Sequence, residues 1–207
     1  MLRTLSEKVD PKHTALVVID MQNDFCHEDG AKARDGADVS HVQAVVPALQ
    51  SLLDGAHEAG VPVIFTQAWH NEWNDSEVRL ERHVDATPNC MEGTWGAEFY
   101  GVFPGPKDYV VRKARYSAFV GTDFDLVLRN RGVRSLLLTG TATSGCVEST
   151  ARDGYMFDYY IVVADDCCAQ GSQERHAASL RAMEGSVGVL ATSKEVLGAW
   201  AERRPSR

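Results

Sequence analysis

The fold class of this chain is decided by one stretch, residues 136–150, which reads LLLTGTATSGCVEST. Three consecutive leucines predict a buried strand, Gly140 and small residues predict a tight turn, and the pattern then predicts a helix that begins at Cys146. A thiol on the first helical turn lies near free N–H groups and the positive end of the helix dipole, which favour thiolate. Cys146 is therefore a candidate nucleophile. A small buried residue in a strand-to-helix turn is the alternative interpretation of an isolated cysteine.

Similar short apolar runs recur along the whole chain and predict six strands, at 15–19, 61–65, 109–111, 136–138, 160–163 and 187–190. Amphipathic stretches separate them. Runs that are apolar on both faces fit a parallel sheet covered by helices on both sides. We therefore predict an α/β fold: a single doubly wound, Rossmann-like domain over residues 1–207, with a parallel six-stranded sheet and helices on both faces.

Helix ends are predicted from local signals. Ser40 with Gln43 indicates a capping box, and Thr192 with Glu195 indicates another. Pro47 lies inside the first of these helical patterns, so it either kinks the helix or marks its true first turn. A further helix is expected from Cys146 to Met156.

Composition limits the classes of protein to which the chain can belong. The 207 residues are 44% hydrophobic and 24% charged, enough for one compact core, and the net charge is −8. This acidity argues against a nucleic-acid partner. Five cysteines without paired spacing do not form a disulfide framework, and no run of about 18 apolar residues could span a membrane. The first residues lack an apolar signal segment, so we expect a cytoplasmic protein without a membrane partner.

Residues 70–107 break the alternation of strands and helices. They hold Trp73, Trp95, Tyr100 and Phe103 among glycines, prolines and charges. Such a segment predicts a lid or a partner surface, and a satellite hydrophobic cluster is the alternative. Together with the apolar helices it predicts a homo-oligomer.

Three reactive side chains stand where predicted strands stop. Asp20 ends the first strand, Lys113 ends the third, and Cys146 follows the fourth. Ligands of open parallel sheets bind at the carboxyl ends of strands, where the strand order reverses. Individually, Asp20 could cap a turn and Lys113 could be a surface charge. Jointly they supply a nucleophile, a carboxylate base and a cation that lowers the pKa of the thiol.

The ordered motifs of the chain resemble the isochorismatase-like cysteine hydrolases, over about residues 14–197. The motifs are VIDMQNDF at 18–25, GTWGAE at 93–98, KARYSAF at 113–119 and the stretch 140–150. Within that family the chain is most similar to the ureidoacrylate, biuret and N-carbamoylsarcosine amidohydrolases. The resemblance implies a catalytic triad of Asp20, Lys113 and Cys146. It also implies a cis peptide between Thr141 and Ala142, with the backbone N–H groups of Ala142 and Cys146 directed at the substrate oxyanion.

The chain departs from the nicotinamidases of that family at their metal site. Those proteins carry Asp-Trp-His after the second strand, whereas this chain has Ala68, Trp69 and His70, and Asn71 and Asn74 follow where a second histidine might stand. One histidine without partners is a poor metal site. We therefore expect no metal and no cofactor, a role for His70 as a pocket wall or surface residue, and a substrate other than nicotinamide.

The predicted activity is hydrolysis of a C–N bond in a small amide or ureido or carbamoyl compound, through a thioester on Cys146. The family's other chemistry, cleavage of a vinyl ether such as isochorismate, needs an acid rather than a thiol, so the retained cysteine favours amidohydrolysis. A non-catalytic binding module on the same fold is a third hypothesis.

Several residues near the triad are candidate substrate contacts. Arg115 shares a face with Lys113 if the third strand continues, and its planar fork suits a carboxylate or ureido oxygen; otherwise it is a solvated surface residue. Ser117 is either a polar contact or a backbone cap. The candidate pocket walls are Phe25, Trp69, Tyr116 and Phe119.

Overall fold

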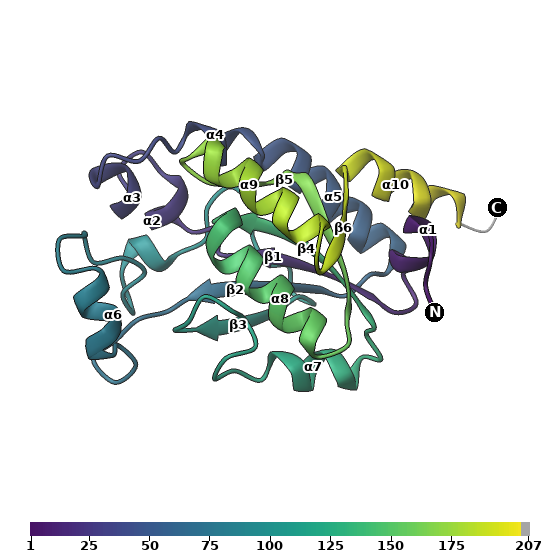
Figure 1. Ribbon diagram of the computed structural model, residues 1–207, viewed down its shortest axis with the longest axis horizontal. Coiled ribbons are helices and arrows are strands. Elements are labelled where there is room, and N and C mark those ends of the chain that lie inside the picture. The colour runs from purple at the N-terminus through teal and green to yellow at the C-terminus, as the bar shows by residue number, and fades with distance from the viewer. Residues whose placement is uncertain (204–207) are drawn as a thin grey trace.

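The computed structural model describes residues 1–203, which form one six-stranded sheet covered by helices. The strands are β1 (Thr14–Ile19), β2 (Val63–Ala68), β3 (Tyr109–Lys113), β4 (Ser135–Thr141), β5 (Tyr160–Ala169) and β6 (Gly188–Ala191). Their order is β3-β2-β1-β4-β5-β6, and every neighbouring pair is parallel. The predicted α/β class and all six strands are confirmed (Figure 1).

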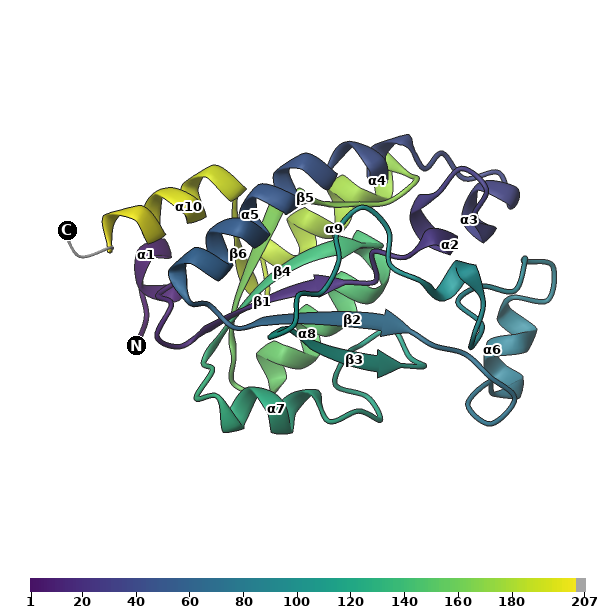
Figure 2. The same cartoon turned by 180° about the vertical axis from the view of Figure 1, so that it is seen from behind.

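Helices cover both faces of the sheet because side chains along each strand alternate between the two faces. Leu16 and Val18 of β1 belong to one hydrophobic cluster, with α5 (Val46–Ala59) and α10 (Ser193–Glu202). The odd-numbered residues of β1 belong to the other cluster, with α7 (Phe124–Asn130), α8 (Glu148–Met156) and α9 (Gln173–Glu184). Figure 1 shows α8 and α9 in front of the sheet, and Figure 2 shows α5 and α10 from the opposite side.

Two of the helix predictions were correct and one was wrong. Thr192 and Glu195 form a reciprocal capping box at α10. Pro47 lies in the first turn of α5, so it begins that helix rather than kinking it. The box expected at Ser40 is absent, because α4 (Ser40–Ala44) has no side-chain cap and the Ser40 amide donates instead to Asp38.

The turn after β4 differs from the predicted helix start. Residues Thr143–Val147 form a π-helical turn, and the α-helix α8 begins only at Glu148. Cys146 therefore lies before the α-helix rather than on its first turn. Single π-turns of this kind are frequent at functional sites. The peptide bond between Thr141 and Ala142 is cis, as the resemblance implies.

The segment 70–107 projects from the end of the sheet toward which the strands point (Figures 1 and 2). It contains a helix that the sequence analysis missed, α6 (Glu77–Arg82), whose first turn is capped by the Ser76 side chain. The segment also holds the short helix η1 (Trp95–Ala97). Trp73 is 89% exposed, and Val78 and Val84 are also exposed.

The remaining short helices lie near the two ends of the sheet. They are α1 (Leu5–Lys8), α2 (Asn23–Cys26) and α3 (Ala31–Arg34). Among the described residues, no helix is both long enough and apolar enough to cross a bilayer.

The strand order reverses between β1 and β4. From β1 the chain proceeds outward to β2 and β3, and then crosses back to β4 before proceeding to β5 and β6. The two central strands approach closely at this point, because a Cβ on Gly140 would lie 2.0 Å from the Ile19 carbonyl oxygen. Gly140 also has φ of 100°, which a side chain would disfavour. Asp20 and Cys146 therefore follow neighbouring strands at the switch point, where such sheets bind ligands.

Candidate active site

Asp20 stands at the carboxyl end of β1 and is fully buried. Its backbone has φ of 49°, in the left-handed region that non-glycine residues seldom adopt outside special sites. The Thr66 hydroxyl, on the adjacent β2, donates to Asp20 Oδ1 at 2.6 Å and accepts from the Asp20 amide at 3.2 Å. This two-way contact fixes the orientation of the carboxylate.

Lys113, the last residue of β3, places its ammonium between the other two candidate catalytic groups. Nζ lies 2.6 Å from Asp20 Oδ2, 3.3 Å from Cys146 Sγ and 3.0 Å from the Arg115 carbonyl oxygen. These contacts use all three N–H donors of the ammonium. Burial alone would lower the pKa of Lys113, but Asp20 and Cys146 together raise it, so the side chain is a fixed cation.

The surroundings of Cys146 favour the neutral thiol. Burial and the nearby Asp20 carboxylate raise the pKa of Cys146 to about 12, against the opposing effect of Lys113. This corrects the expectation that the surroundings of Cys146 favour thiolate, because the residue precedes the α-helix and lies beside a buried carboxylate. The thiol therefore needs a base before it can attack a carbonyl group.

Side chains from β5 and α9 hold the turn that carries Cys146. Gln170, directly after β5, accepts at Oε1 from both the amide and the hydroxyl of Ser144, at 2.9 and 2.8 Å. Thr143 contacts His176 Nδ1 at 2.8 Å through its hydroxyl, and its carbonyl oxygen accepts from Ser179 at 3.2 Å. The π-helical turn is thus held by side chains after β5 and on α9, which are distant in sequence from β4, the strand that precedes the turn.

Replacing Gln170 with alanine is expected to reduce kcat by about tenfold with a smaller change in KM. The substitution removes the acceptor of both the Ser144 amide and the Ser144 hydroxyl, so it loosens the turn that carries Cys146. Steady-state kinetics together with urea unfolding would measure both effects. A matched control is Gln50→Ala, which removes an exposed glutamine that contacts only Asp54. Unchanged kcat in the Gln170 variant would show that this clamp does not position Cys146.

The backbone at Ala142 offers a free donor close to the nucleophile. Within residues 1–203 the N–H of Ala142 donates no hydrogen bond. A preorganised N–H next to Cys146 is suited to an oxyanion, and one such donor can contribute about 3 kcal/mol to transition-state binding. The role of Ala142 and Cys146 as the oxyanion hole remains a prediction.

Phe25 lies on α2, and Trp69 directly follows β2. Both pack against a small buried cluster formed by Ala68, Cys90 and Ala97. The Arg112 guanidinium stacks over the Trp69 ring at 4.0 Å from its centroid, so one face of the indole is already covered. The positions of Phe25 and Trp69 are compatible with their predicted role as pocket walls.

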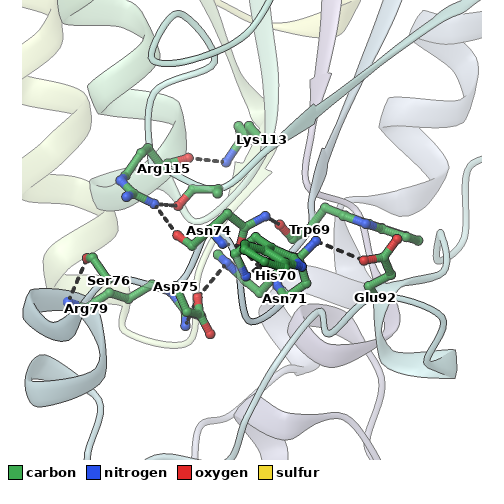
Figure 3. A network of polar contacts seen from close by, with 12 residues as sticks. Trp69, His70, Asn71, Asn74, Asp75, Ser76, Arg79, Glu92, Lys113 and Arg115 are labelled. Carbon is green, nitrogen blue, oxygen red and sulfur yellow. Dashed lines mark hydrogen bonds and ion pairs between the residues drawn. The ribbon is translucent and has the colours of Figure 1, made fainter.

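Arg115 and Tyr116 differ from the sequence-based expectation. β3 ends at Lys113, so Arg115 does not continue the strand and does not share its face by strand geometry. Its exposed guanidinium donates to the carbonyl oxygens of Asn74 and Ala114, at 3.0 and 2.8 Å, as Figure 3 shows in part. In this structure Arg115 supports the segment after β2, and Tyr116 is exposed.

Ser117 and Phe119 belong to the supporting structure. The Ser117 hydroxyl accepts from the Phe119 amide at 3.2 Å, which is the backbone-cap alternative. The Phe119 ring packs against Phe124, Phe157 and Tyr159, at the far end of α8 from Cys146. We therefore correct its assignment from pocket wall to hydrophobic core.

The sequence analysis missed three residues that hold the site together. Thr66 and Gln170 contact Asp20 and the nucleophile turn as described above. The buried Gln22 amide donates to the carbonyl oxygens of Ala68 and Ala97 and accepts from the Ala68 amide, so it joins three segments around the pocket. Gln170 carried no clear signal in the sequence, because the predicted fifth run ends at residue 163 and Asp165 and Asp166 separate that run from Gln170.

Comparison with known proteins settles the relationship. Residues 14–195 match the family model described as the isochorismatase domain. The chain belongs to the isochorismatase family. Its family resemblance, its α/β fold and its class as a hydrolase, all predicted from the sequence, are thereby confirmed.

Individual relatives of this isochorismatase-like hydrolase carry amidohydrolase names. The chain is 37% identical over 187 residues to ureidoacrylate amidohydrolase RutB of Acinetobacter baylyi, covering 82% of this chain and 76% of that protein. It is similar to the crystal structure of a cysteine hydrolase from Pseudomonas syringae, with a TM-score of 0.84, 27% identity and coverage of 98% and 97%. It also resembles N-carbamoylsarcosine amidase from Thermoplasma acidophilum, with a TM-score of 0.72, 26% identity and coverage of 87% and 96%. The predicted amidohydrolase class agrees with these relatives.

Proposed function

We propose that this protein hydrolyses the C–N bond of a small ureido or carbamoyl compound, with Cys146 as nucleophile, Asp20 as base and Lys113 as the fixed cation. The observation that carries the proposal is the position of the Lys113 ammonium, in contact with both the Asp20 carboxylate and the Cys146 sulfur. A buried acid, thiol and ammonium in mutual contact are suited to covalent acyl transfer.

The first half of the reaction moves one proton and breaks the C–N bond. Asp20 accepts the proton of the Cys146 thiol as the sulfur attacks the substrate carbonyl carbon, while Lys113 stabilises the anions. The backbone N–H groups of Ala142 and Cys146 bind the oxyanion of the tetrahedral intermediate. When the intermediate collapses, the C–N bond breaks and the leaving nitrogen takes the proton from Asp20.

The second half returns the enzyme to its resting state. Asp20, again a carboxylate, takes a proton from a water molecule that attacks the thioester carbonyl carbon. The carbon–sulfur bond breaks, and the sulfur recovers its proton through Asp20. Every step uses groups of this chain and water, so the proposal includes no metal or other cofactor. Residues 1–203 hold no group of three His, Cys, Asp or Glu that could bind a metal ion.

The ureido class is supported by the relative named for ureidoacrylate, at 37% identity. The similar structure named as an N-carbamoylsarcosine amidase supports the same class, because its named substrate also carries a carbamoyl group on nitrogen. We propose the same class for this chain. A vinyl-ether hydrolase is disfavoured because the thiol of Cys146 has no role in that chemistry, and a non-catalytic binding module would have no need of a buried charged triad.

A substrate panel tests the proposed function. We expect ammonia release to be fastest from ureidoacrylate, biuret or N-carbamoyl amino acids, and at least about tenfold slower from nicotinamide and simple aliphatic amides, because a carbonyl flanked by two nitrogens suits a site selected for ureido groups. Coupled detection of ammonia, with Cys146→Ala as the blank, measures this. Nicotinamide as the best substrate, or no turnover of any compound in the panel, would contradict the proposal.

We further propose that the protein is a cytoplasmic homo-oligomer in which segment 70–107 forms both a lid and a subunit contact. Exposed Trp73, Val78 and Val84 on one projecting segment are the support for this proposal. Light scattering at micromolar concentration is expected to give a dimer or tetramer. The double substitution Val78→Glu and Val84→Glu is expected to shift the mass toward the monomer, whereas Leu126→Glu, at an exposed position on α7, serves as the control. A monomeric mass for the unaltered protein would refute the assembly.

A further inference from the structure

His70 lies two residues beyond β2, in an extended bridge beside the triad. Its amide donates to the Cys90 carbonyl oxygen at 2.9 Å, and it forms a parallel bridge with Met91. Because side chains alternate along extended chain, His70 shares a face with Thr66, whose hydroxyl contacts Asp20. The residue is only 7% exposed, so this side chain is enclosed beside the candidate active site rather than on the outer surface.

The two ring nitrogens of His70 have different surroundings. Nδ1 is buried, lies 3.3 Å from Asp75 Oδ1 and makes no hydrogen bond of good geometry. Nε2 also makes no hydrogen bond within residues 1–203, but, unlike Nδ1, it is not enclosed by protein atoms. Nε2 is therefore accessible to solvent. The imidazole thus has one nitrogen that faces Asp75, as Figure 3 shows, and one free nitrogen on an otherwise buried side chain.

The charges around His70 keep the imidazole neutral. The pKa of His70 is lowered to about 4, first by burial and then by Arg79 and Lys113, against the opposing effect of Asp75 and Asp20. Arg79 Nη1 lies 2.8 Å from the same Asp75 oxygen, so the carboxylate is already neutralised by a cation. With the ring proton on Nδ1, facing Asp75, the lone pair at Nε2 is available as an acceptor.

We propose that His70 binds the substrate by accepting, at Nε2, a hydrogen bond from an N–H of the ureido or amide group. This inference rests on the proposed function and assigns the residue that recognises the substrate nitrogen. The backbone N–H of Ala142 is a donor, so it can bind the carbonyl oxygen but not an N–H group, and the ammonium of Lys113 has only donors, which contact Asp20, Cys146 and the Arg115 carbonyl oxygen. A ureido compound carries several N–H donors, and an acceptor in the pocket selects for them against esters of the same shape.

Binding to an inactive variant tests the inference apart from turnover. In a Cys146→Ala background, the dissociation constant of ureidoacrylate is measured by calorimetry for His70, His70→Gln and His70→Leu. We expect His70→Leu to weaken binding by about tenfold, because it removes the acceptor, and His70→Gln to weaken it less, because its amide oxygen can take the place of Nε2. In the protein with Cys146 present, the rate of modification by methyl methanethiosulfonate reports whether the triad is intact in each variant.

The neighbours of His70 provide a second test, through pH. Arg79→Met removes the cation that neutralises Asp75, so the pKa of His70 rises and the ring loses its acceptor at a higher pH. In the unaltered protein the acceptor is lost only as the pH falls through about 4. The rise in KM at acidic pH should therefore begin at a higher pH in Arg79→Met than in the unaltered protein. In Arg79→Lys, which keeps a cation beside Asp75, the rise should begin at the same pH as in the unaltered protein. The charged groups that face His70 are Asp75, Arg79, Lys113 and Asp20.

The outcomes separate this inference from the proposed function. Equal binding of ureidoacrylate by the His70 and His70→Leu proteins would overturn the inference. So would a decrease in the rate of thiol modification in His70→Leu as large as the loss of binding, because the substitution would then have disturbed the triad. Unchanged pH profiles in Arg79→Met would also count against it. Absence of binding by the protein that retains His70, for ureidoacrylate and for the other ureido compounds of the panel, would overturn the proposed function, and this inference would fall with it.

Discussion

Replacing Cys146 with serine is expected to lower turnover of the best ureido substrate by about three orders of magnitude or more, with the fold intact. The half-buried thiol lies beside Asp20 and Lys113, and a serine hydroxyl in its place has a far higher pKa, so a weak carboxylate base deprotonates it much less readily. The substitution changes one atom, so the packing of the π-helical turn should survive. Steady-state kinetics and far-UV circular dichroism would measure the two parts of this expectation.

A second cysteine serves as the control for that experiment. Cys167 is also buried but lies in β5 within the hydrophobic core, on the opposite side of the sheet from Val147 and α8. Cys167→Ala should therefore keep near-native kcat while it loses some stability through the lost packing. If Cys146→Ser retained near-native amidase activity, the covalent mechanism would have to be abandoned.

Replacing Lys113 with methionine is expected to abolish detectable turnover and to destabilise the fold by about 3–5 kcal/mol. The Asp20 and Lys113 side chains are both buried and lie 2.6 Å apart, so the substitution leaves a carboxylate enclosed without its partner. Urea unfolding followed by tryptophan fluorescence would give the change in the free energy of unfolding.

A double substitution separates this electrostatic cost from a loss of packing. Asp20→Asn with Lys113→Met removes both charges, so the double variant should be more stable than Lys113→Met alone. An exposed pair offers a matched comparison, because Arg129→Met breaks a surface contact with Asp125 and should cost about 1 kcal/mol or less. A Lys113→Met protein as stable as the original would mean that Asp20 becomes protonated or hydrated without cost.

The layout of the sheet was readable from the sequence because burial on both faces leaves an uninterrupted apolar run. Each of the six predicted runs overlaps an observed strand, and the reactive residues at three strand ends were brought together by topology. The end of each strand was harder to place. β5 continues through Asp165 and Asp166 to Ala169, because pairing with β4 resumes after an irregularity near Gly140. Polar residues inside a strand break the pattern on which the prediction depends.

The environment of the thiol could not be read from sequence alone. Local signals place a helix after the turn, but whether the first turn is α or π depends on contacts with Gln170, His176 and Ser179, which are distant in sequence. The direction of the pKa shift of Cys146 then depends on burial, which is a property of the whole fold.

The aromatic and cationic residues after Lys113 illustrate the same limit. A motif fixes which residues are near the site in sequence, but not which way their side chains point. Phe119 packs into the core because Phe124, Phe157 and Tyr159 converge there, and Arg115 turns to backbone carbonyls of the segment after β2. His70 was set aside as a wall or surface residue, because neither its enclosure nor its Asp75 neighbour is visible in local sequence.

The contact of Gly140 with Ile19 has a consequence for how this enzyme can change over time. Any side chain at Gly140 would force β1 and β4 apart, and these are the strands that end beside the proposed base and the proposed nucleophile. The distance between the Asp20 carboxylate and the Cys146 sulfur thus depends on Gly140, a residue with no side chain to contact a substrate. In a saturation library, position 140 should therefore be as intolerant of replacement as the triad, while the lid residues that face solvent remain free to drift toward new substrates.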